Sequence, residues 1–122
     1  MKIYLKKDGE WELFEGDLAA ELKSRSITIA ASAIINGGAR IGDGAIISDT
    51  FSCITLGPIG SRSDMMTGYM HRGHIWIGTG CFIGDVETFE EKVKETHGNN
   101  RHAKDYGHAV AYLRAKFASE AQ

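Results

Sequence analysis

A six-residue period runs through the first half of the chain and limits its possible folds more than any other feature. Isoleucine opens four successive units, and a cysteine opens the fifth: Ile29, Ile35, Ile41, Ile47 and Cys53. A second residue recurs four places after each of the first four openers: Ala33, Ala39, Ala45 and Phe51. One aliphatic side chain per unit, with glycines near the corners, predicts short strands wound into flat-sided coils around an aliphatic interior.

The same unit returns later, opening at Ile77 and Ile83. The pattern over residues 27–56, and again over 77–88, resembles the left-handed β-helix of hexapeptide-repeat proteins. Because three units make one coil of such a helix, the five units of the first run give fewer than two coils. So short a stub leaves open ends, which we expect other elements or another subunit to cover.

The flanking segments predict a mixed fold. Asp8-Gly9 between alternating runs indicates a hairpin, and Asp17 is placed to cap a short helix that runs through Leu22. Arg72-Gly73 indicates a second hairpin. In TFEE, residues 88–91, the pattern of a capping box places a helix N-cap at Thr88.

That helix is predicted to run to about His97 and to stop at Gly98. A last helix is predicted over residues 103–119, with an apolar face formed by Val110, Leu113 and Phe117. The expected class is therefore α+β: a short hexapeptide-repeat β-helix or β-sheet front with two C-terminal helices.

A length of 122 residues predicts one domain. Its three parts would be a hairpin with a short helix (1–26), the hexad-repeat β region with its hairpin (27–87) and a two-helix tail (88–119).

Composition narrows the functional classes. The formal net charge of −2 argues against a general DNA- or RNA-binding protein, which carries a basic excess. No apolar run approaches the length of a membrane span, about 20 residues, and Met1-Lys2-Ile3 leads directly into a strand pattern, so we expect neither membrane association nor a signal peptide. Cys53 and Cys81 form no CxxC pair, and we interpret them as free buried thiols in a reducing cytoplasm.

GPIGSR, residues 57–62, is the strongest candidate for ligand binding. Gly60 lets a ligand approach the backbone, successive N–H groups can hold an anion, Ser61 adds a donor, and Arg62 offers a planar fork for phosphate. Thr67 follows closely enough to reach sugar hydroxyls. A plain turn that ends the repeat is the alternative. A second candidate surface is ETHGNNR, residues 95–101, whose side chains suit bases and ribose.

Other chemistry is weakly indicated. His71 and His74 are candidates for a general base if the chain is a trimmed acyltransferase of the hexapeptide-repeat type. The pairs His71/His74 and His97/His102 have spacings that suit zinc, but HExxH and paired CxxC motifs are absent from the sequence. We expect no catalytic residues, no metal and no cofactor.

The order of motifs over residues 57–117 resembles the phage Thoeris anti-defence sponges. It runs GPIGSR, alternating hairpin, GCF, TFEEKVKETHGN and YGHAVAYLRAKF. Members of that family sequester the cyclic ADP-ribose isomers made by bacterial TIR-domain immune enzymes, have been linked to cyclic oligonucleotides, and assemble as dimers or hexamers. The resemblance implies a ligand set of Arg62, Phe89, Asn99 and Arg114. In it the arginines neutralise phosphates and Phe89, or its rival Phe82, stacks on a base.

The sequence therefore predicts a non-enzymatic binder of a small cyclic nucleotide, forming a homo-oligomer (dimer, trimer or hexamer) in the bacterial host cytoplasm. The expected ligand-binding residues are Gly60, Ser61, Arg62, Thr67, Phe82, Phe89, Asn99 and Arg114. Two alternatives stay open: the acyltransferase, and a structural module whose repeat only drives oligomerisation. The missing coils argue against the first, and the cluster of Gly60, Ser61 and Arg62 argues against the second.

Overall fold

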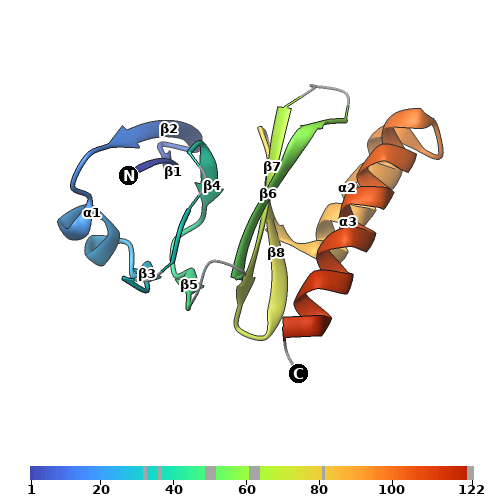
Figure 1. Cartoon of the computed structure of the whole chain (residues 1–122). Coiled ribbons are helices and arrows are strands. Elements are labelled where there is room, and N and C mark those ends of the chain that lie inside the picture. Colours follow the sequence, from blue (N-terminus) through green and yellow to red (C-terminus); the bar gives the residue numbers. More distant parts are fainter. Residues whose placement is uncertain (32, 36, 49–51, 61–63, 81, 121–122) are drawn as a thin grey trace.

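The computed structural model describes residues 1–31, 33–35, 37–48, 52–60, 64–80 and 82–120. It confirms a mixed α+β fold that ends in two helices (Figure 1). The elements in chain order are β1 (Lys2–Lys7), β2 (Glu10–Glu15), α1 (Ala19–Ser24), β3 (Thr28–Ile29), β4 (Ala39–Ile41), β5 (Ile46–Ile47), β6 (Cys53–Ile59), β7 (Asp64–His71), β8 (His74–Gly78), β9 (Ile83–Asp85), α2 (Val86–His97) and α3 (Arg101–Glu120).

The N-terminal hairpin is confirmed. Strands β1 and β2 pair antiparallel across Asp8 and Gly9, whose φ angles of 53° and 82° suit the primed turn that an Asp-Gly pair favours. Helix α1 follows, and the Asp17 carboxylate accepts a hydrogen bond from the Ala19 N–H, although Leu18 holds the N-cap position. The helix extends two residues beyond the expected end, to Ser24.

The six-residue repeat fills a core, as its period predicts. Thr28 pairs with Ile46 and Ile29 with Ile47 in parallel register, a spacing of 18 positions, or three units. One edge of β4 is covered by β1, also in parallel. The inward positions Ala39, Ile41, Ala45 and Ile47 are fully buried. Phe51 lies outside the described residues.

The later pair of units does not form a coil, contrary to the prediction. Gly78 pairs with Ile83 antiparallel, so these residues belong to a four-stranded sheet of order β6-β7-β8-β9. Two matching units are too few to distinguish a coil from an ordinary antiparallel ladder. At residues 57–62, the alternative of a plain turn that ends the repeat does not hold for the described part, since β6 continues to Ile59.

The four-stranded sheet is buried on both faces. Figure 1 shows it standing between the N-terminal lobe and the two helices. Alternation along β7 directs Met66 and Gly68 to the helices, where Leu113 packs so closely that a Cβ on Gly68 would lie 2.7 Å from its Cδ1. Tyr69 points to the opposite face and joins the core of the N-terminal lobe.

The two C-terminal helices are confirmed, with one correction at their start. The N-cap of α2 is Asp85, whose carboxylate accepts a 2.8 Å hydrogen bond from the Thr88 N–H, so the cap lies three residues before the predicted one and the helix begins at Val86. A carboxylate at this position accepts a hydrogen bond from the first helical turn, whose N–H groups have no partner within the helix. Gly98, with φ of 63°, ends α2 as predicted. On α3, Val110, Leu113 and Phe117 are buried as predicted.

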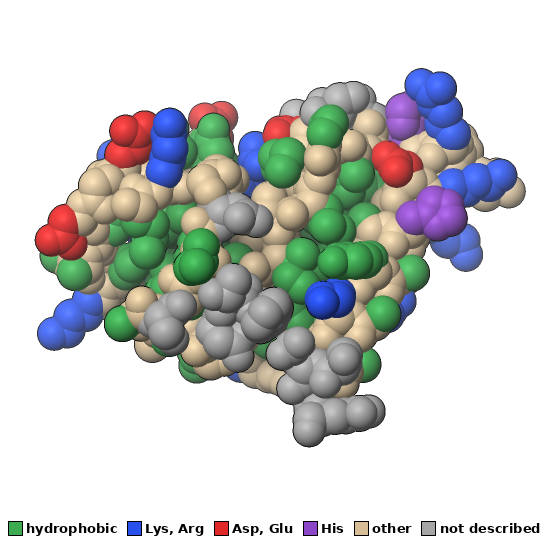
Figure 2. Space-filling model, in the orientation of Figure 1, with side chains coloured by type: hydrophobic (Ala, Val, Ile, Leu, Met, Phe, Trp, Pro, Cys, Tyr) green, Lys and Arg blue, Asp and Glu red, His purple; other side chains and the backbone are tan. Residues whose placement is uncertain are grey.

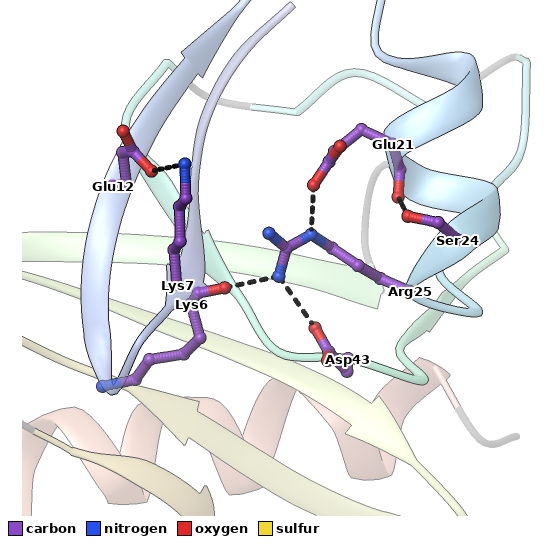
Figure 3. Close-up of polar contacts among 7 residues, drawn as sticks. All are labelled: Lys6, Lys7, Glu12, Glu21, Ser24, Arg25 and Asp43. Carbon is purple, nitrogen blue, oxygen red and sulfur yellow. Dashed lines mark hydrogen bonds and ion pairs between the residues drawn. The ribbon is translucent and has the colours of Figure 1, made fainter.

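Arg25 connects α1 to β1 and to the loop between β4 and β5. Its Nε donates 2.8 Å to Glu21, and its Nη1 lies 3.4 Å from Asp43 and also donates to the carbonyl of Lys6 (Figure 3). Three acceptors from three different segments thus meet one largely buried guanidinium. Such a planar fork orients its partners more firmly than a lysine would. Among the described residues, no helix is long and apolar enough to cross a membrane.

Candidate functional site

The two segments that the sequence singled out for binding meet at Tyr106 of α3. From one side comes Gly60, whose φ is +75° and whose missing Cβ leaves room for the tyrosine ring. The Gly60 N–H also donates a 2.7 Å hydrogen bond to the carboxylate of Asp105. From the other side comes His97, at the end of α2, stacked on Tyr106 with ring centroids 6.0 Å apart.

An aromatic row extends from this point into the core. The Phe89 ring meets Tyr106 edge-on at 5.5 Å between centroids, and Phe82 meets Phe89 at 5.4 Å. At the outer end, His97 lies 5.4 Å from His102. Edge-on and tilted contacts at these distances are favourable for aromatic pairs. The row therefore holds Tyr106 in place while one end of it stays near the surface.

A cleft of about 270 Å³ opens between α2 and α3 beside Tyr106. Its floor is apolar and its wall is formed by small residues that keep the helices close; the lining residues are Phe89, Glu90, Val93, Lys94, Gly98, Ala103, Tyr106, Gly107 and Val110. An apolar floor with a few polar groups at the rim is the usual character of a small-molecule site.

The segment that joins α2 to α3 beside this cleft carries more basic than acidic side chains. Residues 92–104 contain four lysines and arginines against one glutamate, in a chain whose net charge is −2. Figure 2 shows histidine and basic side chains gathered where α2 and α3 meet. The N-terminus of α3 lies here as well, and the helix dipole adds positive potential, although the N–H groups of Ala103 and Lys104 already donate to Asn100. The site is thus suited to a ligand with a flat ring and negative charge.

The predicted anion cradle is only partly described. Ser61 and Arg62 lie outside the described residues, so their predicted contacts with a ligand stay predictions. Gly60 is described, and its N–H already bonds the Asp105 carboxylate. This backbone group therefore faces an anion, but one supplied by the protein itself.

Two predicted site residues are buried. Thr67 has no exposed surface, and its hydroxyl accepts a 2.9 Å hydrogen bond from the Arg40 N–H and lies 3.2 Å from the Thr55 hydroxyl. The predicted contact of Thr67 with sugar hydroxyls is therefore wrong in this conformation. Phe89 is 4% exposed, so it is a core residue rather than a surface stacker, although one side of it lines the α2–α3 cleft.

The other three predicted residues occupy different surroundings. Arg114 forms a two-bond pair with Glu90, at 3.0 and 2.7 Å, and these hydrogen bonds raise the pKa of Arg114 above its ordinary value. Its fork is thus occupied by a carboxylate, which does not favour the predicted phosphate contact. Phe82 is half-buried against the helix-side core, and Asn99 is exposed in the turn between the helices.

The histidines predicted for catalysis do not share an open site. His71 packs edge-on against Trp76 at 5.1 Å, and its Nδ1 is buried without a hydrogen-bond partner, while His74 is exposed at the hairpin turn. The acyltransferase alternative gains no support from this placement. Within the part of the chain that is described, no three His, Cys, Asp or Glu side chains gather as metal ligands would.

Cys53 is free and buried, as predicted, and burial raises the pKa of its thiol to about 12. Cys81 lies outside the described residues.

Sequence reasoning missed Tyr106 and Lys94. Tyr106 precedes Val110 by four positions, so it belongs to the apolar stripe of α3, and this spacing was a signal available in the sequence. For Lys94, an exposed helix position offered no signal, because only the packing of α3 against α2 makes it part of a cleft. Comparison of the chain with protein-family models, curated proteins and solved structures finds no match.

Proposed function

We propose that this protein binds and sequesters a small cyclic nucleotide signal, without altering it, at the cleft between α2 and α3. One observation supports this above the others. The loop at Gly60 and the 95–101 segment, selected independently by their chemistry, converge on Tyr106 beside a basic segment of an otherwise acidic chain. A ring of the ligand would lie over Tyr106, with its phosphates toward Lys94.

The size of the cleft limits how the ligand is held. At about 270 Å³ it is slightly smaller than the usual small-molecule site, whose volume begins at roughly 300 Å³. It would accommodate one base with part of its ribose. The charged remainder would lie at the rim, where lysine and backbone N–H groups are the natural partners of phosphate.

A sequestering role requires tight binding but no nucleophile or metal, and a preformed cleft loses less entropy on capture. The wider proposal follows the resemblance described above: a phage anti-defence sponge acting in the bacterial cytoplasm as a homo-oligomer. In the same proposal, the 18-residue parallel pairing of β3 with β5 is one coil of a left-handed β-helix.

The test is a thermal-shift and calorimetric screen of the whole chain. The panel contains ADP-ribose, cyclic ADP-ribose isomers, cyclic di- and trinucleotides and acetyl-CoA, and each bound compound is recovered and analysed by mass spectrometry. A ligand at 100 times its Kd stabilises the folded state by about 2.7 kcal/mol. We expect a cyclic species to raise Tm and to be recovered intact.

Matched variants locate the site. Lys94→Gln removes a charge at the cleft, and Lys92→Gln removes the same charge from an exposed position of the same helix that does not line it. We expect Lys94→Gln to weaken binding about tenfold or more, as the loss of a charge-assisted contact does, and Lys92→Gln to leave it nearly unchanged. The proposal fails if no cyclic nucleotide binds, if the ligand is turned over, or if both variants bind equally well.

A further inference from the structure

A second cleft lies elsewhere, at the open end of the repeat. It measures about 590 Å³ and lies between α1 and the first turn of the repeat. Its walls are mainly apolar, and include Leu18, Leu22, Ile27, Ile29, Ala30 and Ala33. Unlike the α2–α3 cleft, this cleft is lined by no tyrosine or phenylalanine among the described residues, and its one lysine lies at the rim.

The backbone at this end is incompletely paired. Thr28 and Ala30 donate their N–H groups to β5, to the carbonyls of Ala45 and Ile47. Since alternate residues of a strand point to opposite sides, the N–H and carbonyl of Ile29 point away from β5. In the described part of the chain, β3 has β5 as its sole neighbour. An open strand edge beside an apolar cleft is a surface that proteins normally cover.

The charges at the rim are opposite in sign and lie at opposite ends of one helix. Asp17 precedes α1, and Lys23 occupies its last turn. Both are exposed and both line the cleft. Neither forms an ion pair with any residue that the structure describes; the Asp17 carboxylate accepts only the Ala19 N–H. A surface of this kind is complementary to itself under a two-fold rotation, because the rotation places the lysine of one copy opposite the aspartate of the other.

The platform that carries these charges is preformed. Arg25, directly after α1, bonds Glu21 of the same helix and links the helix to Asp43 and to the carbonyl of Lys6 (Figure 3). The orientation of α1 over the coil end therefore needs no partner to establish it, and little order would have to be gained on association.

From these observations we infer that two copies of this chain associate through their open coil ends, α1 antiparallel to α1, with Lys23 of each copy facing Asp17 of the partner subunit. The apolar cleft walls and the free edges of β3 would be covered in the same contact. Two lysine–aspartate pairs would form, one on each side of the two-fold axis. This surface is separate from the α2–α3 cleft, so the inference does not depend on ligand binding there.

Charge reversal with rescue tests the inference. Sedimentation equilibrium over a wide concentration range measures the dimerisation constant of the full chain and three variants: Lys23→Asp, Asp17→Lys and the double variant. Each single reversal places like charges together twice, and we expect each to weaken dimerisation by about tenfold or more. The double variant restores opposite charges, and we expect dimerisation to recover to near the wild-type value.

Lys92→Asp is the matched control, because it makes the same change on the exposed surface of α2. Thermal unfolding of every variant establishes that it is folded. A wild-type chain that stays monomeric at all concentrations overturns the inference. So does an oligomer that neither single reversal weakens, or one that the double variant fails to restore.

Discussion

Gly60 and Tyr106 lie 46 positions apart in the sequence, and the Tyr106 ring occupies the space where a side chain at position 60 would lie. A Cβ atom on Gly60 would overlap the ring of Tyr106, and the φ of +75° at this glycine is one that other residues adopt at a cost. The neighbouring hydrogen bond, from the Gly60 N–H to Asp105, holds the two segments together. This contact joins the end of β6 to the first turns of α3, and so places the candidate loop beside the candidate cleft.

Comparison of two glycine substitutions should separate backbone strain from steric overlap. Gly60→Ala causes both, whereas Gly73→Ala, at φ of +78° with nothing within 4 Å of its Cβ, causes backbone strain alone. We expect Gly73→Ala to lower the free energy of unfolding by about 1–2 kcal/mol and Gly60→Ala to lower it by clearly more. Urea denaturation measures both values. Equal losses would mean that Tyr106 moves aside freely and is not held in its site.

The Tyr69 hydroxyl is a second long-range connection. It accepts a 3.1 Å hydrogen bond from the buried N–H of Gly42, which links the repeat to the central sheet. Tyr69→Phe leaves that N–H without a partner, and we expect a loss of about 1–3 kcal/mol in the free energy of unfolding. Tyr112→Phe, at a ring that is 48% exposed, is the control and should change it by less than about 0.5 kcal/mol. A similar small effect of both variants would contradict the role assigned to Tyr69.

The hydrogen bond that caps α2 should influence how Tm falls at acidic pH. Hydrogen bonds from Thr88 lower the pKa of Asp85, so its contribution is present above the unfolded-state pKa, near 4, and is lost as pH falls through the folded value. Asp85→Asn still accepts the hydrogen bond but does not titrate, and should flatten the decline of Tm below pH 4. Asp85→Ala should lower Tm at neutral pH as well. Asp8→Asn, in the exposed first turn, is the control; an unchanged acid limb in Asp85→Asn would refute the assignment.

The buried thiol of Cys53 should not react with thiol reagents while the protein is folded. Because burial raises its pKa to about 12, the thiolate is scarce at pH 8, and the side chain is also out of reach. In a Cys81→Ser background, we expect a thiol-specific disulfide reagent to modify Cys53 at a rate that follows global unfolding and rises steeply with urea. Rapid modification in the absence of denaturant would contradict the burial of this residue.

Local patterns account for the elements that were predicted well. Turn chemistry located both hairpins, at Asp8-Gly9 and Arg72-Gly73, and Gly98 located the end of α2. These features depend on the φ angles and hydrogen bonds of a few adjacent residues, which the sequence lists directly. By contrast, the cap of α2 was misplaced by three residues, because Asp85 caps the helix almost one turn earlier by accepting a hydrogen bond from the Thr88 N–H.

The six-residue period predicted, from the sequence alone, that residues 27–56 form short strands with one aliphatic side chain of each unit inward. The parallel pairing of β3 with β5 and the burial of Ile41 and Ile47 agree, whereas the unit that opens at Cys53 lies in β6 of the antiparallel sheet. Which residues form a site was decided by the tertiary structure alone. Phe89 and Thr67 are buried, and Arg114 is paired with Glu90, because two helices and a lobe close over opposite faces of one sheet. The same packing brings Gly60, His97 and Tyr106 together from distant positions. A periodic pattern records the environment of each residue along the chain, whereas contacts between distant segments depend on how whole elements pack.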